Sequence, residues 1–350
     1  MPASKKNSFK VTALNTQLVK NNFLPENQIS STSPKWEIKI SQNLTECHNL
    51  WNKFSPNESV FDLWEIRDAF YQGYKFSPHF LSIYQKSEIV GVLPLWFNAT
   101  PTFGKTASDF EKYTWFGSNW PEDNTFFVQD PQIIPFLLLS CPKPVELACI
   151  KPLPSYDFLK EYPGYALEED KKYFLDLSQV NTLDDFLSQL KKKKRYNLRR
   201  DRKRIMHYDP IINIEDHENI EEMFRLSIER FRKKYPDEPS EQSAFEDERR
   251  KEVFRSLINN AKDYKVRLIT TTINGKIEAV EFGLVYKKTY YALNAGVDVS
   301  HFSGLGVFSN LLVIEDALNL GCTKIDFLES DNNWKASWHL STYYQYQFTK

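Results

Sequence analysis

The stretch from Tyr290 to Lys335 decides the fold, and it reads YYALNAGVDVSHFSGLGVFSNLLVIEDALNLGCTKIDFLESDNNWK. Tyr290 to Ala295 is a short aromatic and apolar run, typical of a strand inside a sheet. From Val307 the apolar residues recur every three or four positions, which predicts a helix that ends at Gly321. Lys324 to Leu328 predicts a second strand. The order is therefore strand, loop, helix, strand.

Two closely spaced glycines stand in the loop before the predicted helix. Glycine lets a ligand approach the backbone, and the unpaired amides of a first helical turn, with the helix dipole behind them, favour a phosphate group. We therefore predict a diphosphate-binding loop. Its residues are His301, Gly304, Leu305, Gly306 and Val307, together with Asn294 on the preceding strand.

The spacing His301-x-x-Gly304-x-Gly306 resembles the pyrophosphate loop of the GNAT acyltransferases, where Arg or Gln normally stands in place of His301 and Gly or Ala in place of Gly306. After the second strand, Asn333-Trp334-Lys335-x-x-Trp338 resembles the closing segment of the BioF2-like or CelD-like branch, which is related to the FemAB transferases. The resemblance implies an acyltransferase whose cosubstrate is acetyl-CoA or another acyl-CoA.

Length and composition set broad limits on the function. A chain of 350 residues favours two domains, and a formal net charge of -1 argues against a protein that binds polyanions over its whole surface. The four cysteines lack C-x-x-C spacing, and His207, His217 and His339 lack ligand spacing, so neither a metal site nor a disulfide framework is predicted. No apolar run is long enough to cross a bilayer, and we expect a cytoplasmic protein. The oligomeric state stays open.

The domain organisation follows from these patterns. Residues 1–34 are polar and lack periodicity, so a flexible tail is predicted. Residues 35–179 repeat the strand and helix order of the second half without its glycine loop, which indicates a degenerate GNAT-like domain. Residues 180–350 would hold the acyl-CoA site. The predicted fold class is α/β, with mixed sheets in tandem GNAT-like domains; an unrelated α/β domain in the first half is the alternative.

Local signals refine the first half. Trp36 to Ile40 alternates as a half-buried strand, and Asn43 is a capping residue for a helix reaching Trp51. Pro94 lies within an apolar run and lacks an amide hydrogen, so it predicts an edge strand or a bulge.

A basic segment follows the predicted domain boundary. Residues 191–204 contain ten cationic side chains among fourteen. The apolar residues at helical spacing are Leu187, Leu190, Leu198 and Ile205. We predict a basic helix with one buried edge, similar to the helix at this place in the BioF2-like family. It is interpreted as a solvated face, as a site where Arg195 and Arg199 bind an anionic substrate or the cofactor's phosphates, or as a nucleic-acid surface.

Two carboxylates and a lysine are candidates for catalysis. Glu281 lies among apolar neighbours on a predicted central strand, and burial raises the pKa of a carboxyl group towards the range that suits a general base. A buried ion pair is the structural alternative. Asp326 and Lys335 match recurrent positions of the family, and we expect one of the two to order the site.

The acid that protonates the leaving thiolate is a tyrosine in many GNAT enzymes. Tyr343, Tyr344 and Tyr346 are all candidates, and the sequence does not choose among them; Tyr344 is carried forward as the candidate acid.

Three functions remain. An acyl-CoA-dependent N-acyltransferase is favoured, with a small-molecule amine as acceptor; by resemblance to the branch, that amine is an amino sugar or a cell-envelope precursor. The second is a FemAB-like transferase that uses aminoacyl-tRNA, disfavoured because the chain lacks a long helical-hairpin insertion. The third is a non-catalytic module that binds a polyanion or a partner.

Overall fold

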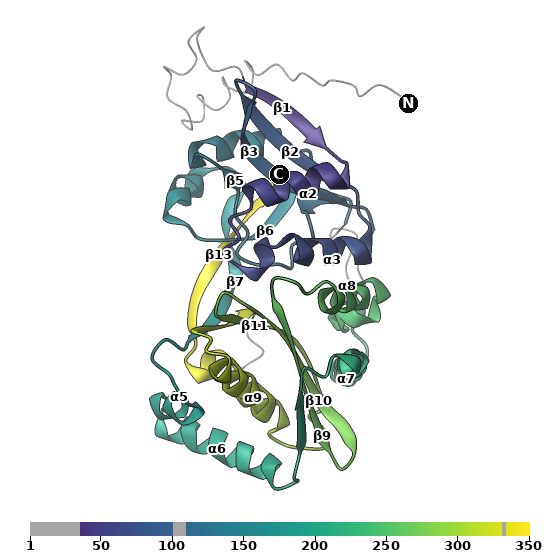
Figure 1. Cartoon of the computed structure of the whole chain (residues 1–350), viewed down its shortest axis with the longest axis vertical. Helices are drawn as coiled ribbons and strands as arrows, with labels where there is room; N and C mark the ends of the chain where they lie inside the picture. The colour runs from purple at the N-terminus through teal and green to yellow at the C-terminus, as the bar shows by residue number, and fades with distance from the viewer. Residues whose placement is uncertain (1–35, 101–109, 331–333) are drawn as a thin grey trace.

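Two β-sheets follow one another along the long axis of the molecule (Figure 1). The computed structural model describes residues 36–100, 110–330 and 334–350, so the predicted tail and Asn333 lie outside the described residues. The first sheet has the order β1-β2-β3-β4, with β5 beside β3. Its strands are β1 (Trp36–Ser41), β2 (Pro78–Gln85), β3 (Glu88–Asn98), β4 (Lys112–Trp115) and β5 (Phe127–Val128).

The second sheet has the order β6-β13-β7-β12-β11-β10-β9-β8. Its strands are β6 (Glu146–Ile150), β7 (Tyr165–Asp176), β8 (Ile211–Ile214), β9 (Lys265–Ile273), β10 (Lys276–Tyr286), β11 (Thr289–Val297), β12 (Lys324–Glu329) and β13 (Ser341–Thr349). The predicted strand, helix, strand unit forms its centre. Because the sheet contains both parallel and antiparallel pairs, the mixed α/β class is confirmed.

The α-helices of the described residues are α2 (Leu44–Phe54), α3 (Trp64–Tyr74), α4 (Ile134–Ser140), α5 (Leu183–Gln189), α6 (Lys192–Met206), α7 (Ile220–Lys234), α8 (Glu248–Asn259) and α9 (Leu305–Asn319). The predicted cap of the first is confirmed, because the Asn43 side chain accepts a hydrogen bond from the Glu46 amide.

The basic segment differs from the prediction in one respect. Leu187 and Leu190 do not belong to the same helix as Leu198 and Ile205, because the chain becomes extended at Leu190 and divides the segment into α5 and α6. All four leucine and isoleucine side chains are nevertheless buried. The packing edge is therefore real, but two helices share it.

Pro94 lies inside the first sheet rather than on an edge strand. It pairs with Phe80 of β2. On the other side of β3, β5 pairs with Gly91 and Val92 while β4 pairs from Leu95 onward, so Pro94 falls in the gap between two partner strands. The missing amide hydrogen therefore costs no ladder bond.

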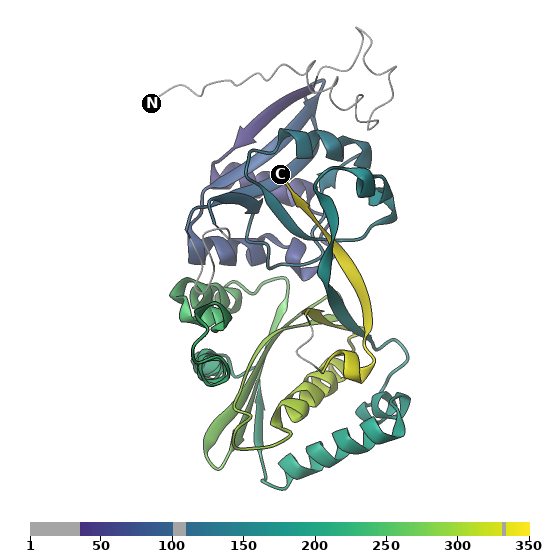
Figure 2. The ribbon, with the colours of Figure 1, turned by 180° about the vertical axis from the view of Figure 1, so that it is seen from behind.

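Helices cover both faces of the second sheet (Figure 2). On one face α9 packs against the central strands, and α5 and α6 pack outside it. On the other face α7 contacts β10 and β11, and α8 packs against α3 of the first half. One apolar core joins the two halves here, since Phe61 and Phe70 share it with Phe254 and Phe282.

Two long strands also connect the halves. β13 pairs with β7 beside the second half and then with β6 beside the first (Figure 1). Its far end is held by paired backbone hydrogen bonds between Val145 and Lys350, each at 3.0–3.1 Å. The Lys350 Nζ atom donates to three carbonyls at the end of α4. The second sheet contains strands from before and after Val180 in the chain, so the domain boundary placed at this residue stays a prediction.

Close packing of α7 on β11 depends on Gly296. A Cβ atom at this position would lie 2.4 Å from the Met223 carbonyl oxygen. We expect Gly296→Ala to lower the free energy of unfolding by about 1–3 kcal/mol, since helix or strand must shift. Chemical denaturation measures this. Gly306→Ala is the control, because a Cβ there meets nothing closer than 3.9 Å; equal stability of the two variants would contradict the packing argument.

Candidate active site

The central feature is an opening between two parallel strands. β11 and β12 pair only from Thr289 to Tyr291 with Lys324 to Asp326. Just beyond, β11 carries a bulge, because Phe282 of β10 faces Asn294 while the next residue faces Ala292. Among the described residues the edge of β11 towards β12 has no strand partner past Tyr291. Such an edge presents backbone N–H and C=O groups that an extended ligand can bind.

The start of α9 lies at the end of this opening. Gly304, the residue before the helix, has φ 95°, a conformation that suits glycine. The first turn has no side-chain cap and no acidic residue, and within the described chain the amides of Gly306 and Val307 have no hydrogen-bond acceptor. Unsatisfied amides at a helix N-terminus attract anions. Binding of a diphosphate by this loop stays a prediction.

The basic helix flanks this loop through its last turns. A Cβ atom on Gly304 would lie 3.0 Å from the Cβ of Asp201, so α6 passes directly beside the loop. Arg204 Nη1 donates to Ser303 Oγ at 2.9 Å. A cation of α6 therefore already contacts the segment before α9.

The two arginines chosen from the sequence lie further away. Arg195 donates to the Ser188 carbonyl at 3.0 Å, and Arg199 pairs with Asp184 at 2.8 Å. Both are engaged by α5 and the turn after it, although Arg199 also lines an open hollow between α5, α6 and α9. The structure does not bring them to the loop, so their role in substrate binding stays a prediction.

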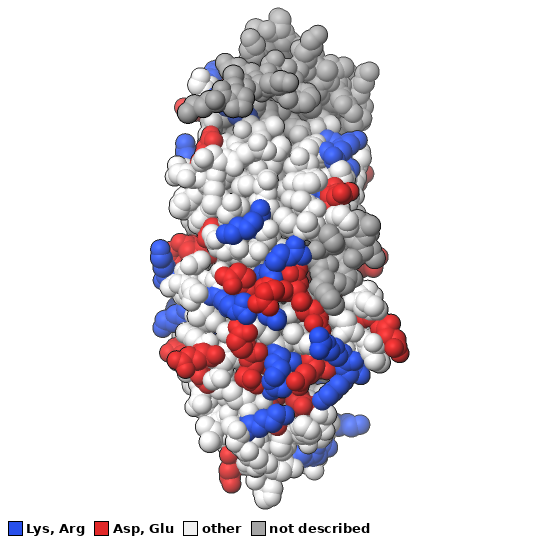
Figure 3. All heavy atoms as spheres, turned by 90° about the vertical axis from the view of Figure 1, so that its right-hand side faces the viewer, with Lys and Arg blue, Asp and Glu red and all other residues white. Residues whose placement is uncertain are grey.

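Positive charge elsewhere is balanced locally. On the surface over α7 and α8, Lys and Arg alternate with Asp and Glu (Figure 3). The ion pairs include Arg225–Glu222, Arg225–Glu229, Arg232–Glu246, Arg249–Asp247, Arg255–Glu221 and Arg255–Glu248. This face therefore offers no uniform patch for a polyanion.

Glu281 lies under α9. Its strand neighbours Ala279 and Ala295 belong to the core on that face. The carboxyl group is 8% exposed and accepts no hydrogen bond among the described residues. Burial raises the pKa of Glu281 to about 8, and the charge of Arg230 opposes that rise. The predicted buried carboxylate is present, without the close basic partner of the structural alternative.

Asp326 faces the opposite side of the sheet. It lies beside Tyr291 in the parallel register, and Tyr291 belongs to the core between the two halves. Glu281 shares the other face with Tyr290, whose ring covers Gly283. The two carboxylates proposed as candidates are therefore not brought together.

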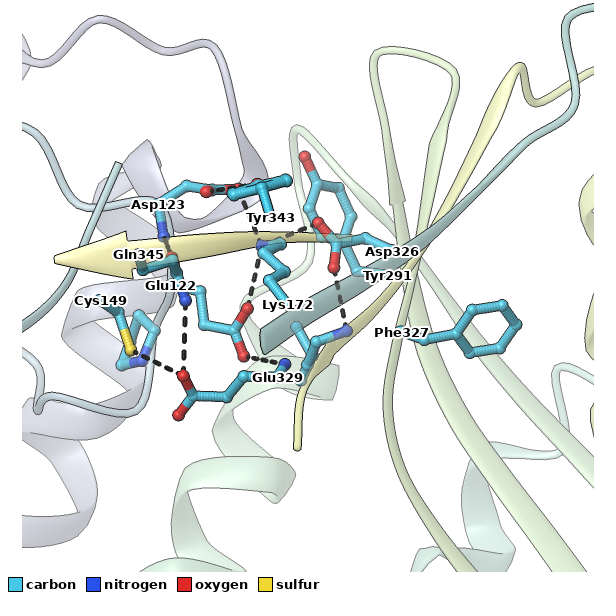
Figure 4. A network of polar contacts seen from close by, with 12 residues as sticks. Glu122, Asp123, Cys149, Lys172, Tyr291, Asp326, Phe327, Glu329, Tyr343 and Gln345 are labelled. Carbon is cyan, nitrogen blue, oxygen red and sulfur yellow. Dashed lines mark hydrogen bonds and ion pairs between the residues drawn. The ribbon is translucent and has the colours of Figure 1, made fainter. Parts of the chain in front are cut away.

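Asp326 instead joins a buried ionic cluster at the junction of the two halves (Figure 4). Lys172 of β7 is fully buried, and its Nζ atom lies 3.0 Å from Glu122, 2.8 Å from Asp123 and 2.9 Å from Asp326. The two acidic residues from the first half lie in the loop after β4. Three carboxylates thus surround one lysine in an environment without solvent.

The cluster contains more carboxyl groups than cations, and this imbalance sets the protonation states of its members. Burial alone would lower the pKa of Lys172, but the surrounding carboxylates hold it well above its usual value, so the lysine stays charged. Burial raises the pKa of Glu122 to about 7, although Lys172 opposes the rise. Burial and the neighbouring charge of Glu168 raise the pKa of Glu329 to about 7. These two carboxyl groups titrate near neutral pH.

Lys335 orders the end of β12. Its Nζ atom donates to the carbonyl oxygens of residues 327–329, at 2.6, 3.3 and 2.8 Å. Asp326 Oδ1 accepts from the Leu328 amide at 3.0 Å. Leu328 has φ 60°, so both side chains support a sharp bend where the strand leaves β11. This matches an ordering role rather than direct chemistry.

The tyrosines of β13 differ in their surroundings. Tyr343 donates to Asp123 Oδ1 at 2.7 Å and so belongs to the ionic cluster. Burial raises the pKa of Tyr343 above its usual value. Tyr344 is 40% exposed, with its ring over Lys171, and Tyr346 stacks on a neighbouring tyrosine. Tyr344 as the acid stays a prediction, although Tyr343 is the one that reaches buried polar groups.

Sequence reasoning missed three members of the cluster: Lys172, Glu122 and Asp123. The available signal was Asp326 itself, because a carboxylate between two apolar strand residues needs a cationic partner when buried. Nothing in the charged run around Lys172 separates it from the exposed Lys171 beside it.

The high pKa of Glu281 predicts a pH dependence of stability. The folded pKa of about 8 lies above the unfolded value of about 4.3. Between these values the native state binds more protons, so the free energy of unfolding falls as pH rises, by up to about 1.4 kcal/mol per unit. We expect Glu281→Gln to remove this slope in urea unfolding from pH 5 to pH 8. The exposed Glu241→Gln should keep it; parallel curves for both variants and the parent would contradict the assignment.

Comparison with known proteins agrees with this architecture. Residues 192–336 match the family described as "Acetyltransferase (GNAT) domain". No curated protein matches the chain significantly. None of the described helices has the length and apolar character needed to span a bilayer.

Solved structures share the fold of this chain over most of its length. FemX is 12% identical, with a TM-score of 0.53 over 89% of this chain and 97% of its own. A tandem GNAT protein from the clavulanic acid biosynthesis pathway is 9% identical, with a TM-score of 0.52 over 90% of this chain and 98% of its own. L-PGS from Bacillus licheniformis is 11% identical, with a TM-score of 0.54 over 88% and 92%. At these identities the likeness concerns the fold. The predicted GNAT resemblance is confirmed: residues 192–336 match the GNAT acetyltransferase domain family, and the chain shares its fold with FemX and with a tandem GNAT protein.

Proposed function

We propose that this protein is an acyl-CoA-dependent N-acyltransferase with one active site per chain, in the opening between β11 and β12. The observation that carries the proposal is the combination of an unpaired β11 edge with the uncapped first turn of α9. Both features suit one extended ligand that ends in a diphosphate.

The chain's own groups would divide the work as follows. The amides of Gly306 and Val307 bind the diphosphate, and the β11 edge near Asn294 orients the thioester arm. An amine acceptor attacks the thioester carbonyl carbon, the C–N bond forms, and the C–S bond breaks. Glu281, or a water that it polarises, takes the proton from the ammonium nitrogen. The departing sulfur receives a proton from an acid, for which Tyr344 is the candidate.

The pKa of Glu281 fits such a base. A carboxyl group with a pKa of about 8 takes up a proton readily near neutral pH, and it is ionised in about a tenth of molecules at pH 7. An amine acceptor suits this base because its ammonium nitrogen supplies the proton that the carboxylate takes. By resemblance to the branch, an amino sugar or a cell-envelope precursor is the acceptor to try first.

Isothermal titration with acetyl-CoA and with CoA tests the proposal. One binding site for each ligand is expected, with release of CoA when an amine acceptor is added. A well-folded protein that binds neither ligand would overturn the donor assignment.

A FemAB-like transferase is the second candidate, favoured by the fold shared with FemX over 89% of the chain. The side chains of Lys192, Lys193 and Lys203 on α6 form no ion pair within the described residues, so they are available to phosphates. This alternative predicts tRNA binding that weakens steeply with salt. Inactivity with every acyl donor, together with salt-sensitive polyanion binding, would instead favour the non-catalytic module.

A further inference from the structure

His301, the residue that departs from the GNAT loop pattern, lies beside two acidic side chains. Its Nδ1 atom is 3.5 Å from Asp298 Oδ2 and 3.7 Å from Glu278 Oε2. Both distances exceed a hydrogen bond. One ligand atom from each of the three residues lies within 4.8 Å of the others.

The two carboxylates are close neighbours across adjacent strands. The Asp298 amide donates to the Glu278 carbonyl at 2.9 Å. The side chains of Asp298 and Glu278 are only 8% and 5% exposed. Like charges directly opposite one another in a sheet are destabilising, and more so out of water. The arrangement therefore needs positive charge between the carboxylates.

Glu278 is aimed into this position by a bulge. The pairing of β10 with β9 passes from Ile277 to Ala279 and leaves Glu278 as the extra residue. A bulge redirects the side chain that it carries. Although Glu278 is 97% buried, since 3% is exposed, its Oε2 atom has no hydrogen-bond partner among the described residues.

Two lysines already place positive charge near the carboxylates, but neither is held tightly. Lys276 lies 3.5 Å from Glu278 Oε1, and Lys233 lies 3.8 Å from Asp298 Oδ2. Their side chains are 48% and 60% exposed, so each can swing into solvent. Neither lysine forms a hydrogen bond with Glu278 Oε2, the atom left without a partner among the described residues.

We propose that Glu278, Asp298 and His301 bind a divalent transition-metal ion, with zinc as the best fit, beside the loop that leads into α9. Two ligands each about 2.0–2.2 Å from a tetrahedral ion lie about 3.4 Å apart. The observed separations of 3.5 and 3.7 Å need little adjustment. The imidazole nitrogen favours zinc over magnesium, which prefers oxygen ligands.

The exposure of the site completes the argument. His301 has a side chain that is 55% exposed, so an ion can enter and keep a water molecule as its fourth ligand. A bound ion would hold the segment from Asp298 to Gly304 in one arrangement and add positive charge near the first turn of α9. The inference does not depend on acyl transfer.

A second acidic set of residues, Cys149, Glu168 and Glu329, has similar spacing but suits a metal less well. Burial raises the pKa of the Cys149 thiol well above its usual value, so the metal-binding thiolate is disfavoured. Its amide also donates to Glu168 Oε1 at 2.7 Å, which occupies one of the candidate ligands. This set serves as the comparison in the experiment.

The test uses tag-free protein from which metal has been removed with a chelator. Zinc chloride is titrated into this protein, and calorimetry measures the binding. One tight site is expected, with much weaker binding of magnesium. His301→Ala and Glu278→Gln should each weaken zinc binding by at least about tenfold. His207→Ala, which removes another exposed histidine, and Glu168→Gln should leave it unchanged.

The spectrum of the cobalt-loaded protein gives an independent readout. The visible absorption of tetrahedral cobalt should appear in the parent and be lost in His301→Ala, an exposed position where folding is not at risk. Absence of stoichiometric zinc binding, equal affinity for magnesium, or loss of binding in Glu168→Gln with retention in His301→Ala would overturn the proposal.

Discussion

Gly306→Trp should abolish acetyl-CoA binding while leaving the protein folded. The residue sits in the first turn of α9, where a new side chain meets no atom closer than 3.9 Å from its Cβ. An indole there would cover the unpaired amides and occupy the space of the diphosphate. We expect affinity to fall at least about a hundredfold, which corresponds to about 2.7 kcal/mol.

Folding should hardly change, because glycine is a poor helix former and its replacement does not strain this backbone. Titration calorimetry gives the affinity, and thermal unfolding gives the stability. Gly306→Ala is the matched control: the family pattern accepts alanine here, so binding should be retained. If the tryptophan variant kept its affinity for acetyl-CoA, the diphosphate would not bind at this loop.

Lys172→Met should destabilise the protein by about 3–5 kcal/mol, because it removes one partner of a buried ionic cluster. Methionine has a similar length, so little packing is lost. Three buried carboxylates, all previously within 3.0 Å of Lys172 Nζ, would then lose their shared cation. Only Lys324, 3.8 Å from Asp326 Oδ2, would still pair with one of them. Urea unfolding measures the loss.

The loss should depend on pH in a definite direction. Without the lysine, the folded pKa values of the buried carboxyl groups rise above their unfolded values, so stability decreases as pH rises. The defect should therefore be larger at pH 8 than at pH 5. Lys171→Met makes the same change on the exposed neighbour and should stay within about 0.5 kcal/mol of the parent. A tolerated Lys172→Met would mean that the cluster contributes little.

The central unit was predictable because its signals are local. The strand, glycine loop and helix follow from periodicity and from Gly304, and the burial of Glu281 follows from its apolar neighbours. Alternation tells which residues of one strand share a face. It does not relate one strand to another, and so Glu281 and Asp326 could be chosen together although they face opposite sides of the sheet.

Contacts between residues far apart in the sequence could not be predicted either, because local patterns do not relate one strand to another. Asp326 was one of two candidates for ordering the site, and its side chain does accept a hydrogen bond from the Leu328 amide. Its shorter ion pair, at 2.9 Å, is with Lys172, about 150 residues earlier in the printed sequence. His301 likewise looked like a replacement within a phosphate loop, because its two acidic neighbours come from separate strand ends.

The path of β13 bears on how the chain folds during its synthesis. The ribosome makes residues 36–176 first, yet β6 and β7 complete their pairing only with residues 341–349. Apolar side chains that rest against Phe348 must therefore wait, exposed, while about 160 further residues are added. The first half cannot reach its final form as an independent nascent unit, and a chaperone that shields that half until β13 arrives would raise the yield of folded protein.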